Sequence, residues 1–229
     1  MKTLGMIGGT SWHSTIDYYR LINDLASKRL DDGSNPPLIL YSLNIAIMRQ
    51  MNPDHISAEY LTISKKLQDA GAEGIIICAN TPHMVFPVVA PRIDIPILHI
   101  ADATASEANN LGIHKLGLIG TKVTMEKDFL KDRLRKEHGV DTLTPGMTSR
   151  EEIHRIISEE LTRGQFNDSA KQFLIEEMAK LRMQGADGII LGCTELPLLI
   201  HPEDFELPLL NTTLLHAEMA VDFIFSEED

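Results

Sequence analysis

Cys193 is the residue of this chain whose position best suits acid/base chemistry. It follows the apolar stretch Ile189–Leu191 and Gly192, and two polar side chains, Thr194 and Glu195, come directly after it. A thiol has a pKa of about 8.5, so modest tuning sets either protonation state near neutral pH. Neighbouring amide groups and the next helix terminus are expected to lower that pKa toward a thiolate. A lone cysteine is more often buried filler, but the turn position and the polar residues after it predict a functional thiol.

The turn around Cys193 has a counterpart 114 residues earlier in the chain. Three segments recur at nearly one offset: Gly71–Thr81 with Gly185–Glu195, Gly5–Gly8 with Gly117–Gly120, and Ile95–Leu98 with Leu207–Leu210. We therefore predict two homologous halves related by a pseudo-twofold axis, with matching loops on opposite sides of one cleft. The position that matches Cys193 holds Ala79, which has no acid or base to offer.

A glycine-rich turn near the start of the chain places Thr10 at the end of the first predicted strand. The segment Gly8–Trp12 opens a helix, whose backbone N–H groups could meet an anion at the positive helix terminus. The alternative interpretation is a tight glycine turn that is capped by Ser11 or Ser14. The segment lacks the third glycine of a dinucleotide motif and the lysine of a P-loop, which disfavours nucleotide binding.

Polar side chains also follow the strand of the first half that matches the Cys193 strand. Asn80 and Thr81 supply an amide, a hydroxyl and main-chain donors that suit a carboxylate. Since ligands of open parallel sheets bind beyond the carboxyl ends of the strands, these groups are expected to face Thr194 and Glu195 across the cleft. His83 could orient the Asn80–Thr81 loop, act as a remote base, or be a structural histidine.

The elements that would position these residues alternate between short apolar strands and longer helices. Strands that are apolar on both faces are typical of a parallel sheet covered by helices on each side. The predicted strands are 3–7, 38–43, 74–78, 97–98, 115–119, 188–191 and 209–210. The predicted helices are 14–28, 57–69, one near 83, 104–110, 125–138, 150–163, 168–184 and 214–225. Residues 31–37 and 141–148 are expected to be exposed loops.

The fold class predicted from this pattern is α/β, with two pseudo-symmetric Rossmann-like lobes, each a mostly parallel sheet covered by helices. The active site is expected in the cleft between them. The first lobe should comprise residues 1–100 with 212–229, because the last helix is expected to return to it. The second lobe should comprise residues 101–211, with approximate boundaries.

Composition limits the classes of partner. The chain has 229 residues, 21 basic and 33 acidic side chains and a formal net charge of −12, which opposes a broad contact with nucleic acid or an anionic membrane. Its apolar runs are far shorter than the roughly 20 residues that span a bilayer, and its start resembles a strand rather than a signal peptide. A cytoplasmic protein is expected. Two cysteines at unmatched positions predict no disulfide framework and no metal site.

Three motifs together resemble the aspartate/glutamate racemase family, which comprises cofactor-independent amino-acid racemases. They are Gly8–Trp12, Cys78–His83 and Gly192–Leu196, and the resemblance covers nearly the whole chain. In that family two thiols flank the α-carbon of the substrate; one removes its proton and the other delivers a proton to the opposite face. The resemblance implies that Cys193 is one of these groups, that no cofactor or metal is needed, and that the protein is a homodimer.

The resemblance also implies a set of residues around the substrate, a small amino acid or dicarboxylate. These are Thr10, Asn52, Ala79, Asn80, Thr81, Thr194 and Glu195. Asn52 lies in a loop where relatives place a substrate-contacting amide. Thr10 stands where many relatives have methionine, which would change the polarity of the pocket and the choice of substrate.

The chain departs from the family pattern at Ala79, where relatives carry the second cysteine. Cys78 is one residue earlier, and since successive side chains of a strand point to opposite faces, it is expected to point into the lobe. Cys78, Thr81 or a held water could serve as the second acid/base of a racemase. Alternatively, the protein resembles the single-cysteine decarboxylases of the same superfamily, or it is a carboxylate-binding protein without turnover, or a racemase with no efficient substrate.

We favour the first hypothesis: a racemase independent of pyridoxal phosphate that acts on aspartate, glutamate or a related small amino acid, with Cys193 as one acid/base. Inversion of a carbon through a planar carbanion needs proton donors on both faces, each within hydrogen-bond reach. A one-cysteine decarboxylase or lyase and a non-catalytic amino-acid or carboxylate binding protein are the alternatives.

Overall fold

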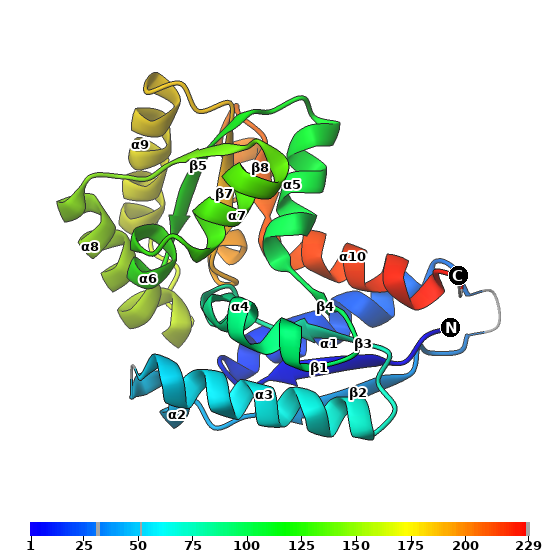
Figure 1. Cartoon of the computed structure of the whole chain (residues 1–229). Helices are drawn as coiled ribbons and strands as arrows, with labels where there is room; N and C mark the ends of the chain where they lie inside the picture. The colour runs from blue at the N-terminus through cyan, green and yellow to red at the C-terminus, as the bar shows by residue number, and fades with distance from the viewer. Residues whose placement is uncertain (31–32, 51, 228–229) are drawn as a thin grey trace. The chain divides into compact units, whose positions relative to one another are not determined.

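A computed structural model describes residues 1–30, 33–50 and 52–227 (Figure 1). The chain divides into two compact units. Unit 1 comprises Met1–His99 and His216–Asp229, and unit 2 comprises Ile100–Leu215. No helix among the described residues is long and apolar enough to cross a membrane.

Unit 1 contains a parallel sheet with the strand order β2-β1-β3-β4. Its strands are β1 (Leu4–Gly8), β2 (Leu38–Ser42), β3 (Gly74–Ile77) and β4 (Ile97–Leu98). Its helices are α1 (Trp12–Ser27), α2 (Ala46–Arg49), α3 (Pro53–Asp69) and α4 (Phe86–Val89), with the 3-10 turns η1 (Thr81–Val85) and η2 (Ala90–Arg92). The last helix, α10 (Thr212–Phe225), begins in unit 2 and continues into unit 1.

The two faces of this sheet are covered by different helices because side chains alternate along each strand. On one face Ile75 and Ile77 of β3 pack with residues of α3 and α4. On the other face Ile76 packs with residues of α1 and α10. Burial of both faces explains why these strands are apolar throughout, as is typical of parallel sheets.

Unit 2 repeats this arrangement with the strand order β6-β5-β7-β8, again all parallel. Its strands are β5 (Lys115–Gly120), β6 (Asp141–Leu143), β7 (Gly188–Gly192) and β8 (Leu209–Asn211). Its helices are α5 (Ile100–Asn110), α6 (Lys122–Glu126), α7 (Phe129–His138), α8 (Met147–Arg155) and α9 (Asp168–Met183). Shorter turns are η3 (Ile156–Glu160, a π-helix), η4 (Leu161–Arg163), η5 (Leu196–Leu198) and η6 (Pro202–Asp204).

The prediction of two α/β lobes, each with a parallel sheet covered by helices, is confirmed. β7 occupies in unit 2 the place that β3 occupies in unit 1, as the repeat predicts. Ile189 and Leu191 of β7 pack against α8 and α9, and Ile190 packs with residues of α5 and α7.

Several predicted elements are wrong in detail. The helix expected over 125–138 is two helices, because Lys127 between them is extended, with φ −80° and ψ 157°. The helix expected from residue 57 begins at Pro53, where Asn52 caps it. The expected loop 141–148 contains β6 and the start of α8. Of the other expected loop, residues 33–37 are in neither helix nor strand, and residues 31–32 lie outside the described part of the chain.

Candidate active site

Cys193 lies directly after β7, in the turn that leads to η5. Its side chain is half-buried and packs against the core of α8, η3 and α9, on the same face of β7 as Ile189 and Leu191. The thiol donates a hydrogen bond to Glu195 Oε2 at 2.9 Å, and the Thr194 hydroxyl donates to the same oxygen at 2.8 Å. The three polar residues of the motif therefore form one hydrogen-bonded group around a single carboxylate oxygen.

The surroundings of Cys193 favour the protonated thiol. Burial raises the pKa of Cys193 well above its usual value, and the charge of the Glu195 carboxylate and its hydrogen bond with the thiol raise that pKa further. Backbone hydrogen bonds from Glu195 and Thr194 oppose this rise, but they are the smaller effects. The local amide groups therefore lower the pKa, as expected, but their effect is too small to give the expected thiolate. At neutral pH Cys193 is a proton donor whose nearest acceptor is the Glu195 carboxylate.

The matching turn of unit 1 follows β3. Ala79 is half-buried and lies two residues after the end of β3, whereas Cys193 directly follows β7 and packs with Ile189 and Leu191. The backbone N–H of Ala79 donates to the Ile77 carbonyl at 2.8 Å. Within unit 1, this position supplies a methyl group where unit 2 supplies a thiol.

Cys78 does not supply the missing group. It is 1 % exposed and packs with Met6 and Ile76 on the opposite face of the sheet, under α1 and α10. Burial raises the pKa of Cys78 far above its usual range, so this thiol stays protonated. The prediction that Cys78 points into the lobe is confirmed.

Asn80 and Thr81 follow Ala79, and His83 holds this turn from within the lobe. Asn80 is buried and Thr81 is half-buried. His83 Nδ1 lies 2.9 Å from the Ala79 carbonyl oxygen and 3.3 Å from that of Asn80, so Nδ1 carries the hydrogen that these carbonyls accept. Of the roles considered for His83, orientation of the loop agrees with these contacts.

The ring of His83 belongs to a buried aromatic cluster. The centroids of His83 and His99 lie 4.6 Å apart, and those of His83 and His216 lie 5.4 Å apart. His216 also shares a hydrogen bond of 2.9 Å with the Tyr18 hydroxyl. Sequence analysis did not predict this cluster, because its members are spread over nearly 200 residues with no common spacing.

Thr10 and Asn52 lie at the ends of other elements of unit 1. The Thr10 hydroxyl lies 3.0 Å from the hydroxyl of Tyr60 in α3. Ser11 is the N-cap of α1, so the interpretation of this segment as a capped glycine turn is confirmed. Asn52 is exposed, and its Oδ1 accepts hydrogen bonds from the backbone of Asp54 and the following residue at the start of α3. Only its NH₂ group therefore remains available to a ligand.

The family of the chain is shown by its match to a family model. The model described as "Asp/Glu/Hydantoin racemase" matches residues 7–220. The chain belongs to the Asp/Glu/hydantoin racemase family. In agreement, it is similar to "Broad specificity amino-acid racemase RacX" of Bacillus subtilis (strain 168), with 22 % identity over 95 % of this chain and 96 % of the relative.

Solved structures of similar proteins match the whole fold of this racemase-family chain. A Yersinia pestis protein solved as a candidate Asp/Glu racemase is 39 % identical, with a TM-score of 0.94 over 99 % of this chain and 100 % of that protein. PH1733 of Pyrococcus horikoshii OT3, described as an aspartate racemase homologue, is 34 % identical, with a TM-score of 0.89 over 99 % and 100 % of the two chains. The relatives are described as a racemase, a candidate racemase and a racemase homologue, and racemases are isomerases.

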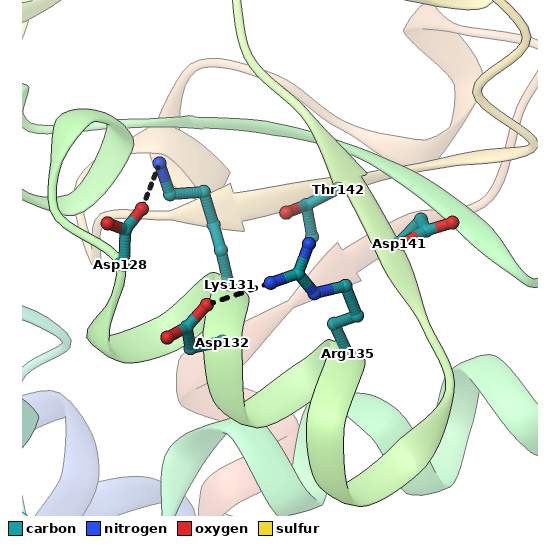
Figure 2. A pocket seen from close by; sticks show the side chains of 6 residues that line it. All are labelled: Asp128, Lys131, Asp132, Arg135, Asp141 and Thr142. Carbon is teal, nitrogen blue, oxygen red and sulfur yellow. Dashed lines mark hydrogen bonds and ion pairs between the residues drawn. The ribbon is translucent and has the colours of Figure 1, made fainter.

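This member of the Asp/Glu/hydantoin racemase family also has a polar hollow on unit 2, of about 250 Å³ (Figure 2). It is lined by Asp128, Lys131, Asp132, Arg135, Asp141 and Thr142. Lys131 pairs with Asp128 at 3.1 Å, and Arg135 pairs with Asp132 at 3.4 Å. None of the predicted site residues lines the hollow, so it is distinct from the Cys193 turn.

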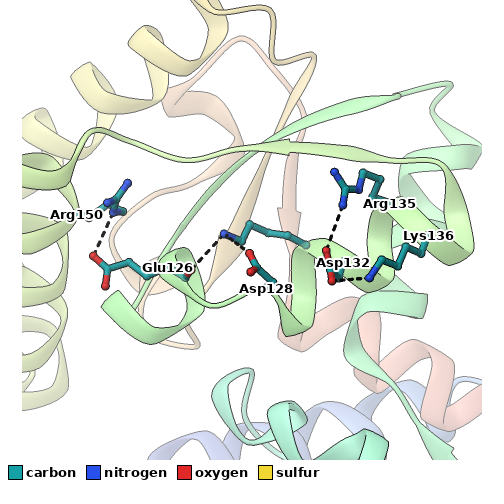
Figure 3. A network of polar contacts seen from close by, with 7 residues as sticks. Glu126, Asp128, Asp132, Arg135, Lys136 and Arg150 are labelled. Atoms are coloured by element: carbon teal, nitrogen blue, oxygen red, sulfur yellow. Dashed lines mark hydrogen bonds and ion pairs between the residues drawn. The ribbon is translucent and has the colours of Figure 1, made fainter.

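Asp128, Asp132 and Arg135 of the hollow belong to a wider network of polar contacts on the racemase-family fold (Figure 3). Lys136 pairs with Asp132 at 2.7 Å, and Arg150 pairs with Glu126 at 3.3 Å. Exposed pairs of this kind contribute little to stability. No group of three His, Cys, Asp or Glu side chains suited to a metal ion occurs within residues 1–30, 33–50 and 52–227.

Proposed function

We propose that this chain is a cofactor-independent amino-acid racemase that acts on aspartate, glutamate or a related small amino acid, with Cys193 as one acid/base group. The observation that carries the proposal is the hydrogen-bonded pair of the Cys193 thiol and the Glu195 carboxylate at the carboxyl end of β7. Ligands of open parallel sheets bind at this end of the strands. Membership in a family of amino-acid racemases supports the same chemistry.

In the proposed reaction, Cys193 protonates the planar carbanion of the substrate. The S–H bond breaks, a C–H bond forms at the α-carbon, and a thiolate remains. In the opposite direction the thiolate removes the α-proton. The thiolate forms from the resting state when the Cys193 proton moves to Glu195 Oε2, to which the thiol already donates its hydrogen bond. The Thr194 hydroxyl, bonded to the same oxygen, keeps this carboxylate in place.

The remaining predicted residues are proposed to bind the substrate. The Thr10 and Thr81 hydroxyls, the Asn80 amide and the Asn52 NH₂ group would contact its carboxylates, while Thr194 and Glu195 would contact its amino group. Ala79 would contribute only van der Waals contact. The proposed reaction uses no cofactor, because Cys193 and either the Thr81 hydroxyl or a bound water transfer the protons.

The second face of the α-carbon lacks a cysteine in this proposal. Cys78 is buried, so we do not propose it as the second acid/base group. The Thr81 hydroxyl or a bound water is proposed for this role instead. Either group is a weaker acid/base than a thiolate near neutral pH. We therefore expect slow racemisation, with unequal rates for the two enantiomers.

A second candidate function is one-sided proton transfer, as in a decarboxylase or lyase. Two observations favour it: Ala79 carries no acid or base, and the Cys193 thiol rests in its protonated form. A decarboxylase needs a single proton donor for the carbanion that remains after carbon dioxide leaves. Its substrate would be a malonate-like dicarboxylate rather than an amino acid.

The test is incubation of single enantiomers of aspartate, glutamate, alanine and serine in deuterium oxide, followed by chiral chromatography and mass spectrometry. The opposite enantiomer, carrying deuterium at the α-carbon, is the result expected of a racemase. Deuterium incorporation with retained configuration would indicate one-sided proton transfer. Carbon dioxide release from a substituted malonate would identify the decarboxylase. Ligand binding with neither exchange nor release would leave only a binding protein and would overturn the catalytic proposal.

A homodimer and a cytoplasmic location are also part of the proposal. Light scattering of the purified chain is expected to give twice the mass of the monomer, and a monomer at working concentration would contradict this. Fractionation of the source cells is the corresponding test of location.

A further inference from the structure

The hydroxyls of Thr10 and Tyr60 form a pair that links the end of β1 to the interior of unit 1. Tyr60 lies in α3 and is 0 % exposed, and its hydroxyl oxygen is 3.0 Å from Thr10 Oγ1. Throughout the described ranges, no other hydrogen bond is found for the Tyr60 hydroxyl. Thr10 itself is half-buried, so part of its side chain is open to solvent.

Either hydroxyl of the pair could donate, and burial decides between the two. If Thr10 donated, the hydrogen of the Tyr60 hydroxyl would be buried without an acceptor, which is unfavourable. If Tyr60 donates, its buried hydrogen has an acceptor in Thr10 Oγ1. Burial also raises the pKa of Tyr60 far above its usual range, so the phenol keeps its hydrogen at any physiological pH. Tyr60 is therefore the donor, and Thr10 keeps a hydrogen that it can donate elsewhere.

The backbone holds Thr10 in one place. Gly9 has φ +89°, in the left-handed region that favours glycine, and a Cβ there would lie 2.2 Å from the Leu43 carbonyl oxygen. The Gly9 N–H donates to Thr15 Oγ1 at 2.9 Å. The turn that carries Thr10 is thus pinned between α1 and the segment after β2.

The sheet register places Thr10 beside the Ala79 turn. Ile7 of β1 pairs with Ile77 of β3, and the two strands are parallel. Thr10 and Asn80 each lie three residues beyond this pair, at the same edge of the sheet. The free hydrogen of Thr10 is therefore presented at the edge where the proposed substrate carboxylate would be bound.

We propose that Tyr60 is a positioning residue that fixes Thr10 as a hydrogen-bond donor to a carboxylate of the ligand. The identity of this ligand as an amino acid or dicarboxylate rests on the proposed function, whereas the donor role of Thr10 does not. The hydrogen bond from Tyr60 to its oxygen holds the Thr10 side chain in one of its three staggered χ1 rotamers. The site then discriminates in favour of ligands whose acceptor lies at that one position.

The test measures binding rather than turnover. Isothermal titration of the full chain with succinate, D-aspartate and L-aspartate is compared for the wild type, Thr10→Val, Thr10→Ser, Tyr60→Phe and the double variant Thr10→Val/Tyr60→Phe. Loss of a hydrogen bond to a charged group predicts that Thr10→Val weakens binding about tenfold to hundredfold. Thr10→Ser keeps the hydroxyl and should bind within about threefold of the wild type.

The double variant separates positioning from a general effect on the fold. Tyr60→Phe releases the Thr10 side chain among its three χ1 rotamers and should weaken binding about threefold. In the Thr10→Val background it should have no further effect on binding. Thr62→Val, which removes an exposed hydroxyl of the same helix, is the matched control and should bind as the wild type. Circular dichroism melting checks that each variant is folded.

Three results would overturn the inference. The first is that the wild type binds none of the three ligands, and the second is that Thr10→Val binds as tightly as the wild type. The third is that Tyr60→Phe weakens binding equally in the wild type and in the Thr10→Val background. Failure of the proposed function is distinguishable. If binding depends on Thr10 but no amino acid exchanges its α-proton, the racemase proposal fails and this inference stands.

Discussion

Replacement of Glu195 by glutamine tests the origin of the raised pKa of Cys193. The substitution removes a negative charge that lies beside the thiol, with 2.9 Å between Sγ and Oε2. Two unit charges at this distance repel by about 1.4 kcal/mol at the dielectric constant of water and by about 6 kcal/mol at an effective value of 20. Glu195→Gln therefore stabilises the thiolate and lowers the pKa of Cys193, although burial still keeps it raised.

The expected readout is faster alkylation of Cys193 by iodoacetamide at pH 8, followed by peptide mass spectrometry. The logarithm of the nucleophilicity of a thiolate falls by roughly half a unit for each unit that its pKa falls, so the gain in rate should lie between about threefold and about 130-fold. Cys78, which is 1 % exposed, is an internal control in the same sample and should stay unreactive.

A matched control for this experiment is Glu203→Gln, which removes an exposed carboxylate at η6. It should leave the alkylation rate of Cys193 within about twofold of the wild type, because an exposed charge is screened by water and salt. An unchanged or slower rate in Glu195→Gln would refute the view that the carboxylate holds the thiol in its protonated form.

Further predictions concern the matching turn, the buried thiol and the core. Ala79→Cys should raise the racemisation rate at least about tenfold, since a positioned acid/base contributes about 10²- to 10⁴-fold, and no gain would contradict the repeat-based assignment of this position. The raised pKa of Cys78 means that its ionisation favours unfolding once pH exceeds the unfolded thiol value of about 9. The free energy of unfolding should therefore fall by about 1 kcal/mol between pH 9 and 10 through this group, and Cys78→Ala should flatten that decline in urea titrations. Ile190→Ala should cost about 2–5 kcal/mol of stability, because the side chain is fully buried, whereas Leu198→Ala at an exposed site should change stability by less than about 0.5 kcal/mol; equal losses would contradict the assigned core.

The sheet architecture could be predicted because its signal lies within single segments and their repetition. Ile75–Ile77 and Ile189–Leu191 are apolar on both faces, and their equivalent places in the two sheets follow from the recurrence of the surrounding sequence. The face of Cys78 was predictable for the same reason, since alternation along β3 puts it with Ile76.

Elements that depend on tertiary contacts could not be predicted in this way. β6 is three residues long and exists through its pairing with β5, so the local sequence of Asp141 and Thr142 indicates only a loop. The break at Lys127 contains neither proline nor glycine, the residues that mark most helix ends. The early start of α3 did have a signal, because Asn52 followed by Pro53 is a typical cap and first helical residue.

The positions of the candidate residues after their strands were predictable, and the electrostatics around Cys193 was less so. Cys193 follows an apolar strand as expected, but its pKa depends on packing against α8, η3 and α9, which the local sequence does not reveal. The spacing of Cys193 and Glu195 did contain a usable signal, since a carboxylate two residues away in a tight turn can fold back onto the thiol. Tyr60, 50 residues from Thr10, had none.

The central claim is that the Cys193 thiol transfers the α-proton. Its most direct test is the NMR-detected exchange of the α-hydrogen of aspartate and glutamate in deuterium oxide, catalysed by the wild type, Cys193→Ala and Cys78→Ala. We expect exchange with the wild type and with Cys78→Ala, and loss of exchange in a folded Cys193→Ala variant. Exchange that persists at the wild-type rate in Cys193→Ala would contradict the account.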